Sequence, residues 1–465
     1  MAKPAAAAAV ASDGGLYRAD PKIYPRETDG RFQRLRRAAA ASLLGLYYVM
    51  PWLTWNGRQA VLFDLPARKF HVLGLTFWPQ DFFYLSWLLI LAGLSLFFFT
   101  ALAGRLWCGY ACPQTVWTEV FLGIERAFEG ERNRRIRLDA APWGAEKLAR
   151  KGGKQVAWIA FALWTGFTFV GFFTPIRELG PRVATLTFGP WETFWTLFYA
   201  FATYGNAGYL REQVCKYMCP YARFQGAMFD PATLVIAYDR ARGEPRGPRR
   251  RGEDPRAAGL GDCVDCTLCV QVCPTGIDIR DGLQYECIAC GACIDACDAV
   301  MDRVAYPRGL IRYATEDALA GRASKILRPR VVVYFLLLAA GFGSFAWSVT
   351  HRVPLLVDVV RDRNALFRVA GDGSIENAYT LKIVNKGDNA RRYRITLDEA
   401  GRIVFAGTAP VEAEVAAGEV LALPVTLRAP AGAVAGRAEI EFVVEATDAT
   451  GIRVEAESRF FGPAP

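Results

Sequence analysis

The sequence predicts a multi-domain membrane protein with an α-helical bundle of five transmembrane spans, a small cysteine-rich α+β domain and a C-terminal all-β sandwich. Three observations predict this fold class. Hydrophobic residues make up 52% of the 465 residues and aromatic residues 13%, which is high for a soluble protein. The chain contains 12 Cys, most of them crowded into one short segment. After residue 351, short segments alternate apolar and polar residues, as strands do.

The ratio of 12 Cys to 2 His excludes several classes of redox protein. A membrane cytochrome b that holds two haems between paired His ligands needs more His than this chain has. Covalent c-type haem needs a Cys-x-x-Cys-His motif, which the sequence lacks. Catalytic zinc sites usually depend on His as well. The chemistry of this protein therefore depends on sulfur.

Five stretches are apolar enough to span a bilayer, and they set the domain boundaries. The predicted spans are Ala38–Trp55, Asp81–Ala103, Gln155–Pro175, Trp191–Leu210 and Val331–Thr350. The fourth carries Tyr, Thr and Asn, so a buried soluble helix is the alternative there. The predicted domains are a tail 1–37, a four-span membrane domain 38–230, a cysteine-rich domain 240–310, the fifth span 331–350 and an outer domain 352–465.

The distribution of Lys and Arg predicts the orientation in the membrane. The six segments outside the spans contain 8, 3, 10, 2, 18 and 14 of these residues in chain order. Positive charge gathers on the cytoplasmic side, so the N-terminus and the cysteine-rich domain are expected inside and the C-terminal domain outside. The last segment is a long domain, whose charges do not count against this orientation. The net charge of +9 therefore requires no nucleic acid as a partner.

Two segments of low complexity flank these domains. The first 15 residues are rich in Ala, carry no cleavable signal pattern and are expected to be disordered, so the first span is an uncleaved anchor. Arg240–Arg256 is rich in Arg, Pro and Gly. It is expected to be a linker at the cytoplasmic surface, either touching anionic lipid head groups or forming a solvated tether.

The membrane part contains an internal repeat. FWPQDF (Phe77–Phe82) precedes the second span and FGPWETF (Phe188–Phe194) precedes the fourth. Just past the same two spans stand CGYACP (Cys108–Pro113) and CKYMCP (Cys215–Pro220), which are 107 residues apart. Each is followed by a further partly apolar run. The sequence thus predicts two helical hairpins of common design.

The cysteine-rich segment has the spacing of a ferredoxin with two [4Fe-4S] clusters. Two successive runs each place three Cys at intervals of three residues and a fourth Cys four residues later. Three close thiolates bind three corners of a cube, and the fourth ligand comes from the other run. The predicted ligands of one cluster are Cys263, Cys266, Cys269 and Cys297, and those of the other are Cys287, Cys290, Cys293 and Cys273. Zinc knuckles and disulfides are the alternatives, and a cytoplasmic site disfavours disulfides.

The four remaining thiols are Cys108, Cys112, Cys215 and Cys219. Residues i and i+4 of a helix lie on one face, so each pair is expected to present two sulfurs together. If the hairpins pack side by side, the four thiols converge, with Met218 as an additional soft ligand. Thiolates suit Cu(I), zinc or an iron–sulfur cluster, and a redox dithiol is a further option. The alternative is that these are small buried residues at helix ends.

Five other polar residues are weaker candidates. His71 in the first outer loop and His351 at the end of the last span are either metal ligands or interfacial polar residues, and the second interpretation is favoured. Glu119, Glu125 and Asn206 lie close to the Cys motifs and are candidates to face a polar interior. The alternating segments after His351 contain no Cys, so that domain is expected to bind or dock partners and to perform no catalysis.

These pieces together resemble the CcoG/FixG family, for which RdxA is another name, over roughly residues 25–465. The resemblance rests on CGYACPQTVWTE, CKYMCPYARFQ, the double cluster run and the following span with its sandwich. It implies an Ig-like sandwich in the periplasm and a multi-pass protein of the bacterial inner membrane. It further implies a cupric reductase that converts Cu(II) to Cu(I) for a cbb-type cytochrome c oxidase. Electrons would come from an unidentified cytoplasmic donor, and oxidase assembly factors or copper chaperones would be partners.

Under this resemblance, the eight ferredoxin cysteines carry electrons and the four other cysteines bind or reduce copper, or hold a third metal centre. Two other functions compete with it. The NapH and NosR membrane ferredoxins share the Cys-x3-Cys-Pro pairs, which favours a quinol-linked electron-transfer subunit, although they lack the C-terminal sandwich. A non-enzymatic copper carrier or assembly scaffold is the third hypothesis.

Overall fold

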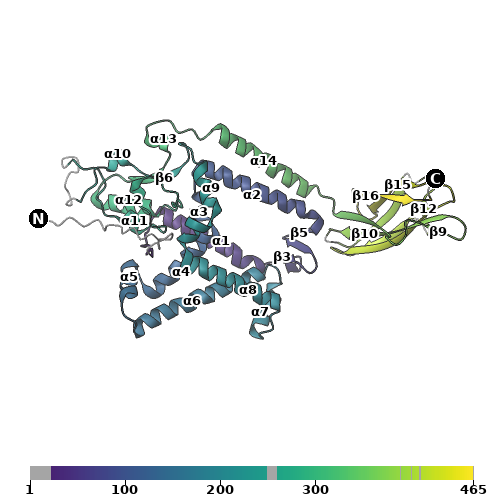
Figure 1. Ribbon diagram of the computed structural model, residues 1–465, viewed down its shortest axis with the longest axis horizontal. Helices are drawn as coiled ribbons and strands as arrows, with labels where there is room; N and C mark the ends of the chain where they lie inside the picture. The colour runs from purple at the N-terminus through teal and green to yellow at the C-terminus, as the bar shows by residue number, and fades with distance from the viewer. Residues whose placement is uncertain (1–21, 249–258, 388, 399–400, 408–409, 464–465) are drawn as a thin grey trace, which may run out of the picture. The chain divides into compact units, whose positions relative to one another are not determined.

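The computed structural model describes residues 22–248, 259–387, 389–398, 401–407 and 410–463, and its helices and strands are labelled in Figure 1. The first 15 residues, which were predicted to be disordered, and residues 249–256 of the predicted linker lie outside the described residues. The chain divides into two compact units. Unit 1 contains the described residues of Met1–Pro51, Leu94–Gly171 and Ile176–Phe335, and unit 2 those of Trp52–Gly93, Phe172–Pro175 and Leu336–Pro465.

The first half of unit 1 is helical (Figure 1). Its helices are α1 (Arg31–Val49), α3 (Leu106–Tyr110), α4 (Pro113–Glu129), α5 (Arg132–Ala140), α6 (Ala145–Val170), α7 (Ile176–Ala184), α8 (Pro190–Thr203), the π-helices η3 (Tyr204–Leu210) and η4 (Val214–Met218), and α9 (Pro220–Met228). Helices α4, α6 and α8 pack around a small core of Phe121, Trp158 and Ala200. Gly166 lies where α6 meets the backbone of α8 at Thr196, so only a residue without Cβ fits there.

The second half of unit 1 is a small α+β domain, as predicted for the cysteine-rich segment. Its elements are β6 (Val235–Tyr238), α10 (Arg240–Gly243), α11 (Leu268–Gln271), η5 (Ile279–Asp281), α12 (Ala292–Val304), β7 (Ile311–Ala314) and α13 (Glu316–Leu319). Strands β6 and β7 pair antiparallel. The carboxylate of Asp295 in α12 accepts hydrogen bonds from the backbone N–H groups of Phe32 and Gln33, at 3.2 and 2.7 Å. It thereby caps the start of α1 and attaches this helix to the domain.

Of the five predicted spans, two lie in helices that are long and apolar enough to cross a membrane among the described residues. These are Pro79–Ala103, formed by η2 (Pro79–Asp81) and α2 (Phe82–Ala103), and α14 (Pro329–Thr350). Their 22 and 22 helical residues correspond to about 33 Å each at about 1.5 Å per residue, which matches the hydrocarbon core of a bilayer. In the most apolar 18-residue stretch of each helix, only 17% and 11%, respectively, is buried.

Two of the five predicted spans are therefore confirmed as long apolar helices, and the other three lie in helices that are shorter or more charged. Helix α1 begins at Arg31 and carries four Arg in its first two turns, and it ends at Val49, short of the predicted Trp55. Helix α6 begins ten residues before Gln155 with several charges, so its apolar part is short. Helix α8 has 14 residues before it continues as a π-helix. The apolar stretches seen in the sequence thus do not coincide with the bounds of these helices.

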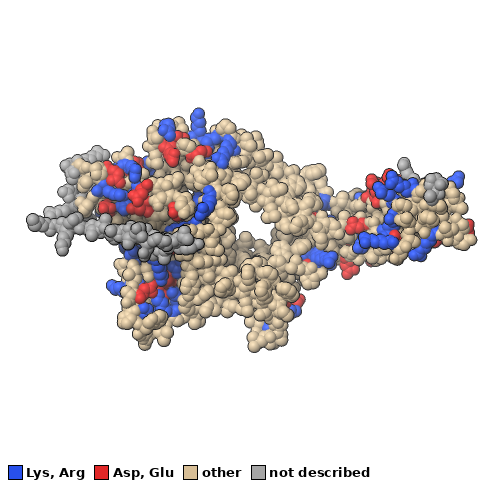
Figure 2. Space-filling view, viewed as in Figure 1, with Lys and Arg blue, Asp and Glu red and all other residues tan. Residues whose placement is uncertain are grey.

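Helices α2 and α14 meet along their length, and each spans the boundary between the units. In unit 2, the hydroxyl of Tyr84 donates to the Ser348 carbonyl at 3.2 Å, and a Cβ on Gly341 would lie 2.6 Å from Leu91. In unit 1, Arg328 pairs with Asp230. The face of these two helices seen in Figure 2 shows no Lys, Arg, Asp or Glu over most of its area. This surface suits a lipid environment.

Unit 2 contains short antiparallel strands and a β-sandwich. The short strands are β1 (Thr54–Trp55), β2 (Arg58–Gln59), β3 (Val61–Asp64), β4 (Lys69–Val72) and β5 (Leu75–Phe77), which follow the 3-10 turn η1 (Met50–Trp52). The sandwich strands are β8 (Leu355–Arg361), β9 (Arg368–Val369), β10 (Ile375–Asn385), β11 (Arg391–Asp398), β12 (Val404–Phe405), β13 (Val411–Val415), β14 (Val420–Ala429), β15 (Arg437–Ala446) and β16 (Arg453–Phe461). One sheet has the order β12-β14-β10-β8 with β9 beside β10, and the other β13-β11-β15-β16.

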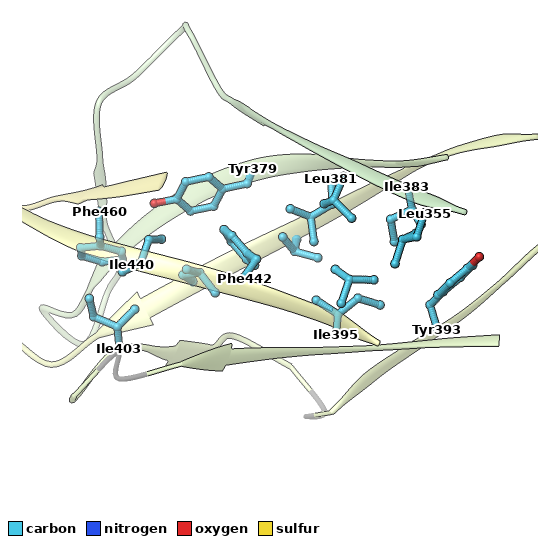
Figure 3. Close-up of a cluster of buried hydrophobic side chains, with 14 of the residues drawn as sticks. Leu355, Tyr379, Leu381, Ile383, Tyr393, Ile395, Ile403, Ile440, Phe442 and Phe460 are labelled. Atoms are coloured by element: carbon cyan, nitrogen blue, oxygen red, sulfur yellow. The ribbon is translucent and has the colours of Figure 1, made fainter. Parts of the chain in front are cut away.

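The alternation in the sequence produces this sandwich. Along β10, every second side chain faces the other sheet, so that Tyr379, Leu381 and Ile383 are buried (Figure 3). From the opposite sheet, Ile395 and Phe442 meet them, both without exposed surface. The sandwich predicted from the strand pattern is confirmed, and its core is mainly apolar, although Asn377 and Asn385 of β10 are also buried.

Candidate functional site

The eight cysteines of the ferredoxin runs line two cavities in unit 1. Cavity A is lined by four of the predicted ligands, together with Arg280 and apolar side chains. These four are Cys263, Cys266, Cys269 and Cys297. Cavity B is lined by the other predicted set, Cys273, Cys287, Cys290 and Cys293, and Cys269 also reaches it. The structure thus brings together the sets that the crossed spacing predicted.

The surroundings of these thiols fit [4Fe-4S] clusters. Apolar residues such as Ile236, Ile277 and Ile279 line cavity B. Burial raises the pKa of Cys269 and that of Cys287 to about 12, so these thiols stay protonated near neutral pH until a metal displaces the proton. Among the described residues, no three His, Cys, Asp or Glu side chains are placed to bind one metal ion. Four thiolates on one zinc lie closer together than four on the corners of a cube, so the arrangement favours a cluster.

The two cavities differ in their access to solvent. Cys266 is exposed and lines cavity A, whereas Cys290 and its neighbour Ala292 are buried at cavity B. Beside cavity A, Arg280 forms ion pairs with Asp278 and Asp265 at 2.6 and 2.5 Å. The positive charge of Arg280 beside cavity A is therefore balanced by these two carboxylates.

The remaining cysteines, Cys108, Cys112, Cys215 and Cys219, are called the four-thiol group below. Cys108 lies in α3 and Cys215 in the π-helix η4, whereas Cys112 and Cys219 are the residues before α4 and α9. Both of the latter have extended backbone, with φ and ψ of −63° and 128° for the first and −81° and 109° for the second. The prediction that each pair shares one face of one helix is therefore wrong. Each Pro that follows starts a new helix, because its fixed φ suits the first helical position.

The four thiols nevertheless converge. Burial raises the pKa of Cys108 to about 12, and the nearby Cys112, Cys215 and Cys219 contribute to this shift. Burial likewise raises the pKa of Cys215 to about 11, with contributions from Cys112 and Cys219. The Cys108 thiol donates to the amide oxygen of Gln225 at 3.5 Å. The convergence expected from the repeat is thus present, although no three of these thiols close on a single ion.

The four-thiol group lies directly beside cavity B. Cys108 packs against the buried cluster that contains Ile288 and Cys290. A Cβ added to Gly109 would lie 2.7 Å from the Ile288 carbonyl oxygen and 2.9 Å from the Cys290 Cα. Only glycine allows the first Cys motif to approach the segment around Ile288 and Cys290 this closely. This segment is called the ligand loop of cavity B below. Cys215 also lines a small cleft together with Ile288.

The other candidates occupy different places. Glu119 accepts a hydrogen bond from Gln33 and pairs with Arg36 at 2.5 Å. Glu125 is fully buried, and although burial opposes its ionisation, the charges of Arg211, Arg135 and Lys154 hold the pKa of its carboxyl below its ordinary value. Asn206 accepts a hydrogen bond at its backbone carbonyl from Gln114 at 2.8 Å. These groups form structural polar networks beside the thiols.

The two histidines belong to unit 2. His71 in β4 shares a hydrogen bond with the Thr76 hydroxyl at 3.0 Å, and burial with the charges of Arg58 and Lys69 lowers its pKa to about 4. His351 stacks on Trp347 with a ring separation of 5.0 Å. Met218, the extra soft ligand of the sequence prediction, is 60% exposed. The interpretation of both histidines as structural polar residues agrees with these contacts.

Sequence reasoning missed Arg105 and Gln225. Arg105 is 3% exposed, and its guanidinium donates to the carbonyl of Ala222 in α9. It also influences the thiols of Cys108 and Cys215 electrostatically. A signal was present in the motif GRLWCGYACP, where a cation stands three residues before the first Cys.

Three parts of the chain match known protein families. Residues 84–129 match a 4Fe-4S binding domain, residues 210–316 a 4Fe-4S dicluster domain, and residues 345–463 the IG-like fold at the C-terminal of FixG. The chain is 40% identical to the nitrogen fixation protein FixG of Rhizobium meliloti over 83% of this chain and 80% of FixG. It is 42% identical to protein RdxA of Cereibacter sphaeroides over 90% of this chain and 91% of RdxA. The chain belongs to the FixG/RdxA family.

Membership of the FixG/RdxA family confirms the resemblance found in the sequence. The matched domains show an iron–sulfur electron-transfer protein of the oxidoreductase type, and the two apolar helices agree with a membrane-associated protein. Among solved structures, a FixG-related protein from Vibrio parahaemolyticus is 35% identical and aligns with 23% of this chain and 95% of its own, with a TM-score of 0.21.

Proposed function

We propose that this protein reduces Cu(II) to Cu(I) at the bacterial inner membrane for the assembly of a cbb-type cytochrome c oxidase. The observation that carries the proposal is the position of the four-thiol group, whose Cys108 packs against the ligand loop of cavity B. Thiolates prefer Cu(I) to Cu(II), so a site built from thiols favours the reduced product. The NapH-like, quinol-linked function and the copper carrier remain the competing hypotheses.

The residues divide into two roles under this proposal. Cys263, Cys266, Cys269 and Cys297 would hold one cluster in cavity A, and Cys273, Cys287, Cys290 and Cys293 would hold the other in cavity B. When bound, these clusters would supply one-electron transfer. Copper is the substrate: each Cu(II) gains one electron from a reduced one-electron carrier of the cytoplasm and leaves as Cu(I).

Other residues determine the path of electrons from the cytoplasmic carrier to the four-thiol group. Cys266 is exposed, so cavity A is the side open to the cytoplasmic electron carrier. Gly109 brings the first Cys motif against Ile288 and Cys290, which keeps the distance to the four-thiol group short. Two of the four thiols lose their protons as Cu(I) binds. With the N-terminus and both cavities on the cytoplasmic side, the sandwich in the periplasm docks oxidase assembly factors or copper chaperones.

The proposal is tested on the full-length protein in detergent. The protein is reduced with dithionite, freed of excess reductant and mixed with Cu(II), and Cu(I) is detected with a colorimetric chelator. A variant with all four of these cysteines changed to Ala is expected to lose copper reduction while keeping the EPR signals and about eight iron atoms of two clusters. Met218→Leu, an exposed neighbour, serves as the matched control and keeps full activity.

Two results would contradict the proposal. Full copper reduction by the four-cysteine variant would show that the clusters or other groups reduce copper without these thiols. An iron content near twelve in the wild type that falls to eight in the variant would assign the thiols to a third cluster. Reduction of the clusters by a quinol would favour the quinol-linked function.

A further inference from the structure

A buried cation lies among the thiols without a carboxylate to balance it. Arg105 precedes α3 and is 3% exposed. Among the residues that the structure describes, no Asp or Glu forms an ion pair with it, and its Nε has no hydrogen-bond partner. A buried charge without a partner is costly, so an anionic group is expected nearby.

The groups around Arg105 that can become anionic are thiols. Its guanidinium contacts α9 at the Ala222 carbonyl, three residues after Cys219. Its own carbonyl accepts the Gly109 amide at 3.3 Å, so the residue is fixed one turn before Cys108. Through α3 the residue is tied to Cys108, and through α9 it is tied to Cys219, which directly precedes that helix. These thiols come from both halves of the repeat.

A comparison with other buried cations shows that this environment is specific. Arg280 beside cavity A is 7% exposed and is paired with Asp278. Arg36, near Cys290, is 8% exposed and is paired with Glu119. These two arginines have their counter-charge inside the fold, whereas Arg105 has protonatable thiols in that position.

We propose that Arg105 is a positioning residue whose buried charge balances an anionic copper–thiolate centre formed by the four-thiol group. Cu(I) bound by two or more thiolates carries a net negative charge, which the buried guanidinium compensates. The inference rests on the proposed function because it takes Cu(I) as the product held by these thiols. The inference thus explains why the fold buries the positive charge of Arg105 beside a site that binds a copper ion.

The repeat provides a matched position of opposite charge. Adding the offset of 107 to Arg105 gives Glu212, which stands three residues before Cys215. Glu212 is partly exposed, whereas Arg105 is buried. Because the two side chains carry opposite charges, neutralising them in turn changes the charge near the thiols in opposite directions.

The test measures Cu(I) affinity and needs no electron transfer. Full-length protein in detergent is titrated anaerobically with Cu(I) against a competing Cu(I) chelator, and iron content confirms that both clusters are retained. Arg105→Gln keeps a donor for the Ala222 carbonyl but removes the charge, and is expected to weaken Cu(I) binding at least about tenfold. Arg105→Lys is expected to restore most of the affinity. Glu212→Gln is expected to leave it unchanged or stronger.

Three results would overturn the inference. Unchanged affinity in Arg105→Gln would show that the charge is irrelevant to copper. An equal loss in Arg105→Lys or in Glu212→Gln would show a packing effect. Absence of Cu(I) binding by the wild type would remove the centre itself. Since copper reduction is measured separately, affinity that ignores Arg105 in a protein that reduces Cu(II) leaves the proposed function intact.

Discussion

The first Cys-x3-Cys-Pro motif lies in an α-helix that packs against the ligand loop of cavity B, whereas the second lies in a π-helix whose Tyr217 and Met218 are each 60% exposed. The local design is shared: in both, the second Cys is extended and the next Pro begins a helix. The positions between the cysteines differ, since Gly109 corresponds to Lys216 in the second motif. The repeat thus duplicates the thiols, but the residues around the two copies differ.

The comparison teaches that equal motifs do not imply two equal sites. The first motif supplies the close approach to the ligand loop through Gly109 and the buried cation Arg105. The second supplies two thiols and α9, whose Ala222 carbonyl fixes Arg105. Under the proposed function, each half completes the other and the four-thiol group acts as a single site shared between them.

The largest expected effect comes from removing either thiol pair. If the site is shared, the double variant Cys108→Ala with Cys112→Ala is expected to lose more than about tenfold in copper reduction, because residues that act as a unit are not additive. The double variant Cys215→Ala with Cys219→Ala should lose as much, and the fourfold variant no more. The rate of Cu(I) formation by dithionite-reduced protein measures this. Independent halves, with additive partial losses, would show two separate sites.

A second, smaller effect distinguishes the motifs by stability. Gly109→Ala places a Cβ 2.7 Å from the Ile288 carbonyl and 2.9 Å from the Cys290 Cα, which are backbone atoms that cannot rotate away. The overpacking is expected to cost about 1–3 kcal/mol. Thermal loss of the visible cluster absorbance in detergent measures it as a lower transition temperature.

The matched control is Lys216→Ala, the same position in the second motif. Its expected cost is below about 1 kcal/mol, since part-exposed charged side chains contribute little. An equal loss of thermal stability in both variants would show that the two motifs are packed alike and would remove the asymmetry on which the comparison depends.

The ferredoxin part and the sandwich were predictable because their signals are local. Three ligands such as Cys287, Cys290 and Cys293 are close in sequence, so their spacing alone groups them. In β10, the alternation of apolar and polar residues directly predicts one buried face. The convergence of the four thiols was predictable from the repeat. The role of Arg105 was not predictable, because it depends on which polar groups remain without a partner after the chain has packed.

Helix boundaries around the membrane part were harder to predict. The spacing of Cys108 and Cys112 fits one helical face, but the Pro after the second Cys begins α4 and breaks that face. Helix α8 has enough apolar residues for a span but turns into a π-helix at Tyr204. In both cases the length of the helix depends on backbone partners that a linear pattern does not contain.

The smallest expected effect concerns a hydrogen bond that only the first motif has. The Thr115 hydroxyl donates to the Cys108 carbonyl at 2.6 Å, whereas the equivalent residue of the second motif, Ala222, has no hydroxyl. Thr115→Ala makes the first motif resemble the second, and is expected to cost about 1 kcal/mol because the carbonyl at the end of the short helix α3 loses its donor.

Thr115→Ser separates the hydroxyl from the methyl group. It keeps the donor to the Cys108 carbonyl, so its thermal transition should stay close to that of the wild type while that of Thr115→Ala falls. Equal losses in the two variants would assign the effect to methyl packing. The second motif forms without this bond, so a fall in thermal stability without any change in iron content would show that the bond holds the first motif against the ligand loop of cavity B and is not needed to build a Cys-x3-Cys-Pro turn.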